Sequence, residues 1–313
     1  MEKIDNMNDI KNSLWIEKHR PDSLDGYVGN NHIVEKVKNY IKNNDVPHLL
    51  FYGKAGTGKT SLSKIITNHI DCDLLSINAS DFNGVDVIRD KIKGFSSSMG
   101  FKKWKIVFLD ESDYLTPNAQ AILRNLMETF STSTRFILTC NYIEKIIEPI
   151  QSRCQMFEII PPSKKDVIKR MKEIMNIEKV KYDMGDLETL VNSSYPDIRS
   201  IINLIQQQVV EGELKLDKNS SIQLNYMGEV LSVLKSKNDS TKNLNLIRKI
   251  ITDSKVKDFV PLYRFLFDNV DEFSVDNVGK TIKQISDYQY KDSFVGDKEI
   301  NIIAMFFEIL RDK

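Results

Sequence analysis

The chain has 313 residues, which is long for a single hydrophobic core, so we expect two or three domains. Its 41% apolar and 28% charged residues, with 44 basic against 44 acidic side chains, are typical of an ordinary soluble protein. Three cysteines without a CxxC pair argue against a disulfide framework or a structural zinc site. No apolar run approaches the roughly 20 residues that span a bilayer, and the N-terminus is unlike a secretory signal, so we expect a cytoplasmic protein without a membrane contact.

A segment that combines aromatic and basic side chains follows the polar residues 1–13. Its sequence is Trp-Ile-Glu-Lys-His-Arg-Pro over residues 15–21. Such side chains can line an adenine pocket when a nucleotide-binding fold follows, although taken alone they are better explained by a tryptophan that closes a small core. An amphipathic helix is predicted next, over residues 31–43. The candidate base-pocket residues are Trp15, Arg20, Tyr27 and Val28.

The glycine-rich loop Gly53–Thr60 has the pattern G-x-x-x-x-G-K-[ST]. The apolar run at residues 48–52 predicts a strand before it and the spacing of residues 61–66 a helix after it, which is the context that a phosphate-binding loop requires. In such a loop backbone N–H groups cradle phosphates, Lys59 would reach the β- and γ-phosphates, and Thr60 would bind Mg²⁺. The alternative is a glycine-rich turn without a ligand. The candidate nucleotide-binding residues are Gly53, Lys54, Ala55, Gly56, Thr57, Gly58, Lys59, Thr60 and Ser61.

A basic helix is predicted over residues 85–95, after a second strand at residues 74–78. Between residues 85 and 105 six side chains are basic and two are acidic. A charged face of this size is usually only solvated. Here it is a candidate contact with a nucleic-acid backbone, because Arg89 and Lys93 lie four residues apart on one helix face.

An uninterrupted apolar run at residues 106–109 ends in two carboxylates, Asp110 and Glu111. Such a run predicts a strand buried on both faces of a parallel sheet, and ligands gather at the carboxyl ends of such strands. Asp110 is therefore a candidate Mg²⁺ ligand, and Glu111 is a candidate base that orients and deprotonates an attacking water. Any strand must end somewhere, so the pair alone would mean little. Together with the loop it predicts phosphoryl transfer from a nucleoside triphosphate to water.

A helix capped by Thr116 and two further strands, at residues 135–141 and 156–160, complete an α/β pattern. Asn141 ends the first of these strands beside the expected position of the γ-phosphate. Only helices are predicted beyond Pro161, and a polar break at residues 217–221 divides them. We therefore predict three domains. They are a P-loop domain with a five-stranded parallel sheet flanked by helices (1–160), a small helical lid (161–222) and an all-helical collar (223–313).

These motifs, in this order, resemble the small subunits of replication factor C. The opening W-I-E-K-H-R-P is similar to the W-V-E-K-Y-R-P of that family, and the resemblance covers residues 15–154 almost continuously. It implies an AAA+ ATPase subunit of a sliding-clamp loader. The motifs that carry it are the phosphate loop, 78–81 with 84–89, 110–113, 119–128, 139–141 and 150–154.

The family resemblance also implies partners and roles. Such loaders are five-membered assemblies, here with several copies of this chain and one different subunit, that use ATP and Mg²⁺ to open a ring-shaped clamp at a primer–template junction. Asn141 and Arg199 resemble sensors of the nucleotide, and Arg153 resembles the arginine finger given to the neighbouring subunit's ATP. The remaining implied roles are a switch that restrains Glu111 (Asn78), a coupling of DNA contact to the ATP site (Gln120), and contacts along the template backbone (Arg89, Lys91 and Lys93).

Several positions depart from the family pattern. His19 replaces the usual Tyr, and Ser112 replaces an Ala, without removing a chemical group that the reaction needs. Asn125 stands where cellular relatives have a second Arg, and Asp197 directly follows Pro196 where they often have Gly-Asp. Both of the latter differences resemble the T4-like bacteriophage branch, so we expect a phage protein, in which case its compartment is the host cytoplasm.

Two other functions fit parts of the pattern. A Holliday-junction helicase shares the AAA+ core, but the segment from Trp15 to Pro21 and the Ser-Arg-Cys motif around Arg153 argue against it. A loader subunit that is only a scaffold would lack a working site, whereas here every catalytic position is filled.

Overall fold

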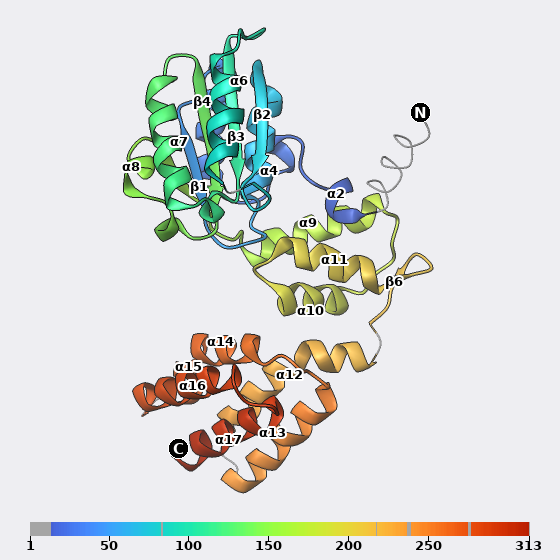
Figure 1. The fold of residues 1–313 in the computed structure, drawn as a ribbon. Coiled ribbons are helices and arrows are strands. Elements are labelled where there is room, and N and C mark those ends of the chain that lie inside the picture. The colour runs from blue at the N-terminus through green and yellow to red at the C-terminus, as the bar shows by residue number, and fades with distance from the viewer. Residues whose placement is uncertain (1–13, 83, 217, 237–238, 275–276, 313) are drawn as a thin grey trace. The chain divides into compact units, whose positions relative to one another are not determined.

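The computed structural model describes residues 14–82, 84–216, 218–236, 239–274 and 277–312. The polar segment 1–13 lies outside this range. The chain divides into two compact units, one ending at Leu214 and one beginning at Lys215 (Figure 1). The predicted boundaries near residues 160 and 222 remain predictions. Over the described ranges, none of the helices combines the length and the apolar character that crossing a membrane requires.

A parallel five-stranded sheet forms the centre of the first unit, as the sequence predicts (Figure 1). The strand order is β2-β3-β4-β1-β5, so β1 lies between β4 and β5. The carboxyl ends of β1, β3 and β4 therefore lie side by side at one edge, where parallel sheets bind ligands. The strands are β1 (Leu49–Tyr52), β2 (Cys72–Asn78), β3 (Trp104–Asp110), β4 (Thr134–Cys140) and β5 (Gln155–Glu158).

Alternate residues of each strand point to opposite faces of the sheet, and both faces are covered. Val107 and Leu109 pack into a core that includes side chains of α7 (Pro117–Thr129). Ile106 and Phe108 pack into a second core with side chains of α3 (Asn31–Asn43) and α4 (Lys59–His69). Burial on both faces explains why the central strand β3 is a continuous apolar run rather than an alternating one, whereas the edge strands β2 and β5 are more exposed.

The basic segment is not the single regular helix that its sequence predicts. It consists of α5 (Val85–Val87), the π-helical turn η2 (Ile88–Ile92) and α6 (Lys93–Ser97). Ile88 and Ile92 are buried in the core beneath α7, whereas Arg89, Lys91 and Lys93 are exposed. The two isoleucines thus face the core, and the three basic side chains lie on the solvent side. π-Helical turns are rare and often occur at functional sites.

Three helices with acidic or hydroxyl N-caps complete the first unit: α9 (Lys164–Ile177), α10 (Met184–Ser194) and α11 (Ile198–Gln208). The prediction that only helices follow Pro161 is wrong at one place, because β6 (Val209–Val210) and β7 (Glu213–Leu214) form a short antiparallel hairpin directly after α11. Short helical segments of this unit are α2 (Trp15–Lys18), η1 (Leu24–Gly26), η3 (Ser112–Tyr114), η4 (Ile143–Lys145) and α8 (Glu148–Gln151).

The second unit is helical, as predicted, with a core that includes the fully buried Tyr263 and Phe306. Its helices are α12 (Lys218–Lys235), α13 (Ser240–Ser254), α14 (Val260–Asp268), α15 (Val270–Phe273), α16 (Val278–Asp292) and α17 (Lys298–Arg311).

Candidate functional site

A cavity opens at the carboxyl ends of β1, β3 and β4. Its lining combines the segment before α3, the glycine-rich loop, the ends of β3 and β4, and side chains of α9 and α11. The lining residues are Ile16, His19, Arg20, Pro21, Gly26, Tyr27, Val28, Ala55, Gly56, Thr57, Gly58, Lys59, Thr60, Ser61, Asp110, Glu111, Thr139, Cys140, Asn141, Arg170, Ile198, Arg199 and Ile202.

The glycine-rich loop keeps its shape through glycines with positive φ, and Gly53 and Gly56 are the two that have the closest neighbours. Gly53 has φ +140°, and a Cβ there would lie 2.5 Å from the carbonyl oxygen of Ile159. Gly56 has φ +73°, and a Cβ there would lie 2.0 Å from Oδ1 of Asp197 on the lid. Both values of φ disfavour side chains in any case. Glycine at these two positions therefore lets Ile159 and Asp197 pack directly against the backbone of the loop.

Lys59 is the first residue of α4 and is only 7% exposed. Its Nζ donates to the carbonyl oxygens of Gly53 at 2.8 Å and Lys54 at 2.7 Å. Gly53 and Lys54 thus lie behind the lining, where they position the lysine, although the sequence places them with the nucleotide-binding residues. Burial lowers the pKa of Lys59, while the nearby Asp110 carboxylate acts in the opposite direction.

Asp110 connects two strands and the loop helix. Its Oδ1 accepts a hydrogen bond from the Thr60 hydroxyl at 2.9 Å and another from the Thr139 hydroxyl. Because the Thr60 hydroxyl donates its hydrogen to Asp110, the lone pairs of the hydroxyl oxygen remain available to bind a cation. Thr139, at the end of β4, was not among the predicted site residues. The motif Thr139-Cys140-Asn141 that carries the family resemblance was the signal that could have identified it.

Glu111 follows Asp110 in a left-handed conformation, with φ +55°. This conformation costs a residue other than glycine about 1–2 kcal/mol. The backbone N–H of Glu111 donates to Thr139 Oγ1 at 3.1 Å, and η3 begins directly after it. The bond and the turn hold Glu111 at the cavity, which Asn141 also lines. Strained residues of this kind are typical of active sites.

Of the predicted base-pocket residues, Arg20, Tyr27 and Val28 line the cavity. Trp15, which the sequence predicts for the same pocket, does not reach the lining. Its ring is 8% exposed, and its backbone N–H donates to Gln206 Oε1 of α11 at 3.0 Å. Trp15 packs behind the cavity because α2 lies against α11. His19 lines the cavity in its place, with Nε2 2.6 Å from Glu178 Oε1 of the lid.

The lid contributes to the cavity Arg199, a predicted site residue, and three residues that sequence reasoning missed: Arg170, Ile198 and Ile202. Arg199 is in the first turn of α11, whose N-cap is Asp197. Arg170 of α9 donates to the backbone carbonyl of His19 at 3.3 Å. No local pattern marks these residues, because only the packing of the lid on the segment before α3 brings them to the site.

Asn78 and Gln120 lie outside the cavity lining. Asn78 is exposed, and its Oδ1 accepts from the backbone N–H of Ser80 at 3.1 Å. Gln120 is buried, and its Nε2 donates to the carbonyl oxygens of Leu115 and Lys145 at 3.1 and 2.9 Å. Its Oε1 accepts from Ile147 N at 2.9 Å, so Gln120 ties the start of α7 to the segment before α8.

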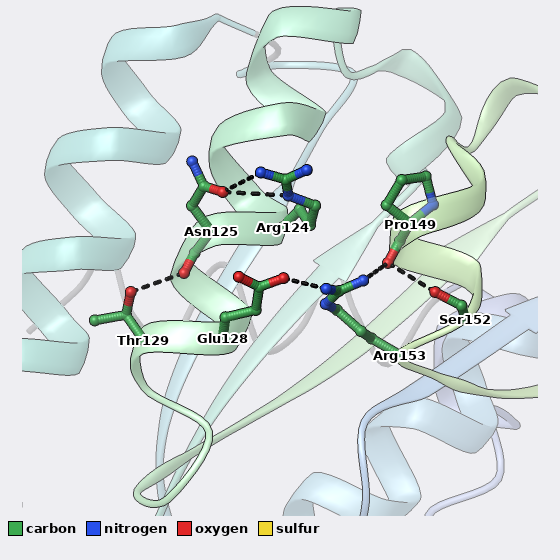
Figure 2. Close-up of polar contacts among 7 residues, drawn as sticks. All are labelled: Arg124, Asn125, Glu128, Thr129, Pro149, Ser152 and Arg153. Carbon is green, nitrogen blue, oxygen red and sulfur yellow. Dashed lines mark hydrogen bonds and ion pairs between the residues drawn. The ribbon is translucent and has the colours of Figure 1, made fainter.

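Arg153, Arg89, Lys91 and Lys93 are exposed and do not line the cavity (Figure 2 shows Arg153). The predicted site residues thus fall into two sets. Most of those assigned to the nucleotide surround one cavity, and those assigned to a neighbouring subunit or to DNA lie on other surfaces.

The cavity has the chemistry of phosphoryl transfer. A glycine loop with a buried lysine suits phosphates, the oxygens of Thr60 and Asp110 suit a hard cation such as Mg²⁺, and Glu111 is a carboxylate held at the lining. The residues that form it come from the segment before α3, the glycine-rich loop with the N-terminus of α4, the ends of β3 and β4, and the lid.

Comparison with known proteins gives consistent matches. Residues 49–162 match the family described as "ATPase family associated with various cellular activities (AAA)". A replication factor C small subunit of Sulfurisphaera tokodaii is 44% identical over 211 residues, which are 65% of this chain and 64% of that protein. The chain thus spans about 64% of the length of that relative. A replication factor C small subunit of Aeropyrum pernix is 40% identical over 257 residues, 79% of each chain.

The Holliday junction branch migration motor RuvB of Thermotoga maritima has a similar structure, with a TM-score of 0.53 over 81% of this chain and 80% of that one. The two sequences are 17% identical, so this likeness concerns the fold alone.

Proposed function

This chain belongs to the replication factor C small subunit family, and we propose that it is the ATP-hydrolysing subunit of a DNA sliding-clamp loader. The observation that carries the proposal is the network at Asp110. One carboxylate oxygen joins Thr60 of the loop helix to Thr139 of the neighbouring strand, beside Lys59 and Glu111. Binding and hydrolysis of a triphosphate need these groups on one cavity.

Each residue has a distinct task in the proposed reaction. The loop N–H groups and Lys59 bind the β- and γ-phosphates of ATP. Thr60 and Asp110 would hold Mg²⁺, which when bound withdraws charge from the phosphates. Glu111 orients the attacking water and accepts its proton, and Asn141 hydrogen-bonds at the γ-phosphate. Arg199 brings a positive charge from the lid, and Arg20, Tyr27 and Val28 face the adenosine.

We infer that the site becomes complete only in an assembly. Arg153 is exposed and outside its own chain's cavity, which suits a side chain offered to ATP bound by a neighbouring subunit. The proposed assembly has five members, several copies of this chain and one different subunit, and acts on the clamp at a primer–template junction in the cytoplasm. Arg89, Lys91 and Lys93 are proposed to contact the DNA backbone. Asn78 and Gln120 are proposed to relay that contact to the site.

The relatives reported above are archaeal, and the comparisons give no support to the bacteriophage branch that Asn125 and Asp197 suggested. The Holliday-junction motor stays the weaker alternative, since the likeness to it is limited to the fold. A non-hydrolysing scaffold is also weaker, because Lys59, Asp110 and Glu111 all line the cavity.

The experiment that tests the proposal is a measurement of ATP hydrolysis by the assembled complex, with and without clamp and primed DNA. We expect strong stimulation that requires both clamp and primed DNA. Hydrolysis that depends on four-way DNA junctions instead would favour the branch-migration motor. The absence of hydrolysis, with ATP still bound, would favour the scaffold.

A further inference from the structure

Outside the cavity, one hydrogen bond and one ion pair hold the side chain of Arg153 (Figure 2). Its NH1 donates to the carbonyl oxygen of Pro149 in α8 at 2.7 Å, and its NH2 pairs with Oε1 of Glu128. Glu128 lies in the last turn of α7, so the two contacts come from two different helices.

We propose that Glu128 is a positioning residue for Arg153, which it aims at the ATP of a neighbouring subunit. The inference rests on the proposed function, in which Arg153 acts in trans. It adds a residue to that reaction: Glu128 touches neither ATP nor the reacting water, and it acts through the direction that it gives to Arg153.

The neighbours of Glu128 on α7 explain why it pairs with Arg153 (Figure 2). Arg124 lies one turn before Glu128, where a helix normally forms an i, i+4 ion pair. However, the side chain of Arg124 donates to Asn125 Oδ1 from Nε at 3.2 Å and from NH2 at 2.6 Å. Asn125 thus engages the arginine that would compete for Glu128, and the Glu128 carboxylate is left to Arg153.

The two contacts orient Arg153 without using up its donors. A guanidinium has five N–H donors, and the two contacts of Arg153 with the described residues use two of these donors. The side chain is 35% exposed, so another chain can reach the remaining donors. A free arginine side chain has many rotamers, and ordering it costs conformational entropy. Restricting it beforehand lowers the cost of placing it at the transition state.

Stability alone gives little reason for this pair. Glu128 is 47% exposed, and exposed ion pairs contribute little to folding stability and are screened further by salt. The consequence of losing Glu128 should therefore appear in the rate of hydrolysis rather than in folding.

The test is a double-mutant cycle on Glu128→Ala and Arg153→Ala, measured as ATPase of the complex assembled from full-length chains with clamp and primed DNA. We expect Glu128→Ala to lower kcat roughly tenfold with an unchanged KM, because only the orientation of Arg153 is lost. Affinity for a fluorescent ATP analogue should not change. In the Arg153→Ala background the same substitution should have no further effect. Glu128→Asp should restore part of the rate, and Asp71→Asn, which breaks the exposed pair with Lys102, is the matched control.

Two results would overturn the inference and leave the proposed function standing: an unchanged kcat in Glu128→Ala, or an equal loss in both backgrounds. If Arg153→Ala itself hydrolyses ATP normally, the trans role of Arg153 fails and the inference falls with it. If the unmodified complex does not hydrolyse ATP at all, the proposed function fails at the first step, and the two failures are thus distinguished.

Discussion

The cavity and the surface around Arg153 are built in opposite ways. In the cavity, Lys59 is 7% exposed and binds two carbonyls, and Asp110 accepts from two hydroxyls. At the surface, Arg153 and Glu128 are 35% and 47% exposed and meet through one ion pair.

The difference separates what one chain determines from what needs a second one. Buried groups with several partners are fixed when the chain folds, because breaking any of their bonds leaves an unpaired polar atom. The partly exposed side chain of Arg153 only prefers one orientation, and a neighbouring subunit must supply the contacts that fix it. Substitutions in the two regions should therefore fail at different steps of the reaction.

The largest effect is expected for Arg153→Ala. Loss of an arginine that acts in trans should lower hydrolysis in the assembled complex by roughly 10³-fold, since such arginines contribute that much to phosphoryl transfer. Binding of a fluorescent ATP analogue to the same complex should be unchanged. Normal hydrolysis in this variant would show that Arg153 does not act on the ATP of a neighbouring subunit.

Lys59→Ala should fail one step earlier. Without the buried ammonium, affinity for ATP should fall by roughly 100-fold, as expected for the loss of a charge-assisted contact in a site of low dielectric. Titration with the fluorescent analogue measures this, with the exposed Lys42→Ala as control. Unchanged affinity would show that the glycine-rich loop does not bind the nucleotide.

Removing charge at Arg89 and Lys93 should have a smaller effect, on DNA alone. With both replaced by glutamine, DNA-stimulated hydrolysis should weaken, and the slope of log affinity against log salt should become shallower by about 2. Basal hydrolysis without DNA should not change. The exposed Lys38 and Lys42, replaced in the same way, provide the control. Stimulation that is unaffected at every salt concentration would contradict the assignment.

The last prediction concerns folding and not hydrolysis, through His48, a partly buried group outside the cavity lining. Burial and the nearby Arg135 lower the pKa of His48 from 6.5 to about 4. The unfolded chain then binds one more proton between pH 6.5 and about 4. Stability from this group is therefore full above pH 6.5 and is lost as the pH falls toward 4.

We expect this loss to be roughly 1–3 kcal/mol, discounted for the partly exposed ring. Urea unfolding at pH 7 and pH 4.5 measures it. His48→Gln, which keeps an acceptor for the backbone N–H of Phe136, should remove the His48 contribution to the pH dependence. An equal pH dependence in both proteins would contradict the prediction.

Local sequence predicted the sheet and the phosphate loop well, because their signals are local. The apolar run at residues 106–109 is typical of a strand buried on both faces of a parallel sheet, and the loop needs glycine at Gly53 and Gly56 for its backbone angles. Thr116 and Pro117 likewise begin α7 as predicted, with Thr116 Oγ1 accepting from Ala119 N at 3.3 Å.

Other parts of the site depend on contacts between distant segments. Arg170 and Ile202 reach the cavity only because the lid packs beside it, and Trp15 is withdrawn from it for the same reason. The π-helical turn was not predictable either: Ile88 and Ile92 are spaced four apart, which suits a regular α-helix equally well.

A Cβ at position 56 would overlap the side chain of Asp197, although the two residues lie far apart in the sequence. Asp197 also caps α11 by accepting from Ser200 N at 3.0 Å, so its carboxylate cannot easily move aside. Over evolutionary time the two positions are therefore not independent. A residue larger than glycine at 56 requires a shorter one at 197 as well as a left-handed backbone, and we expect homologous sequences to vary at these two positions together rather than singly.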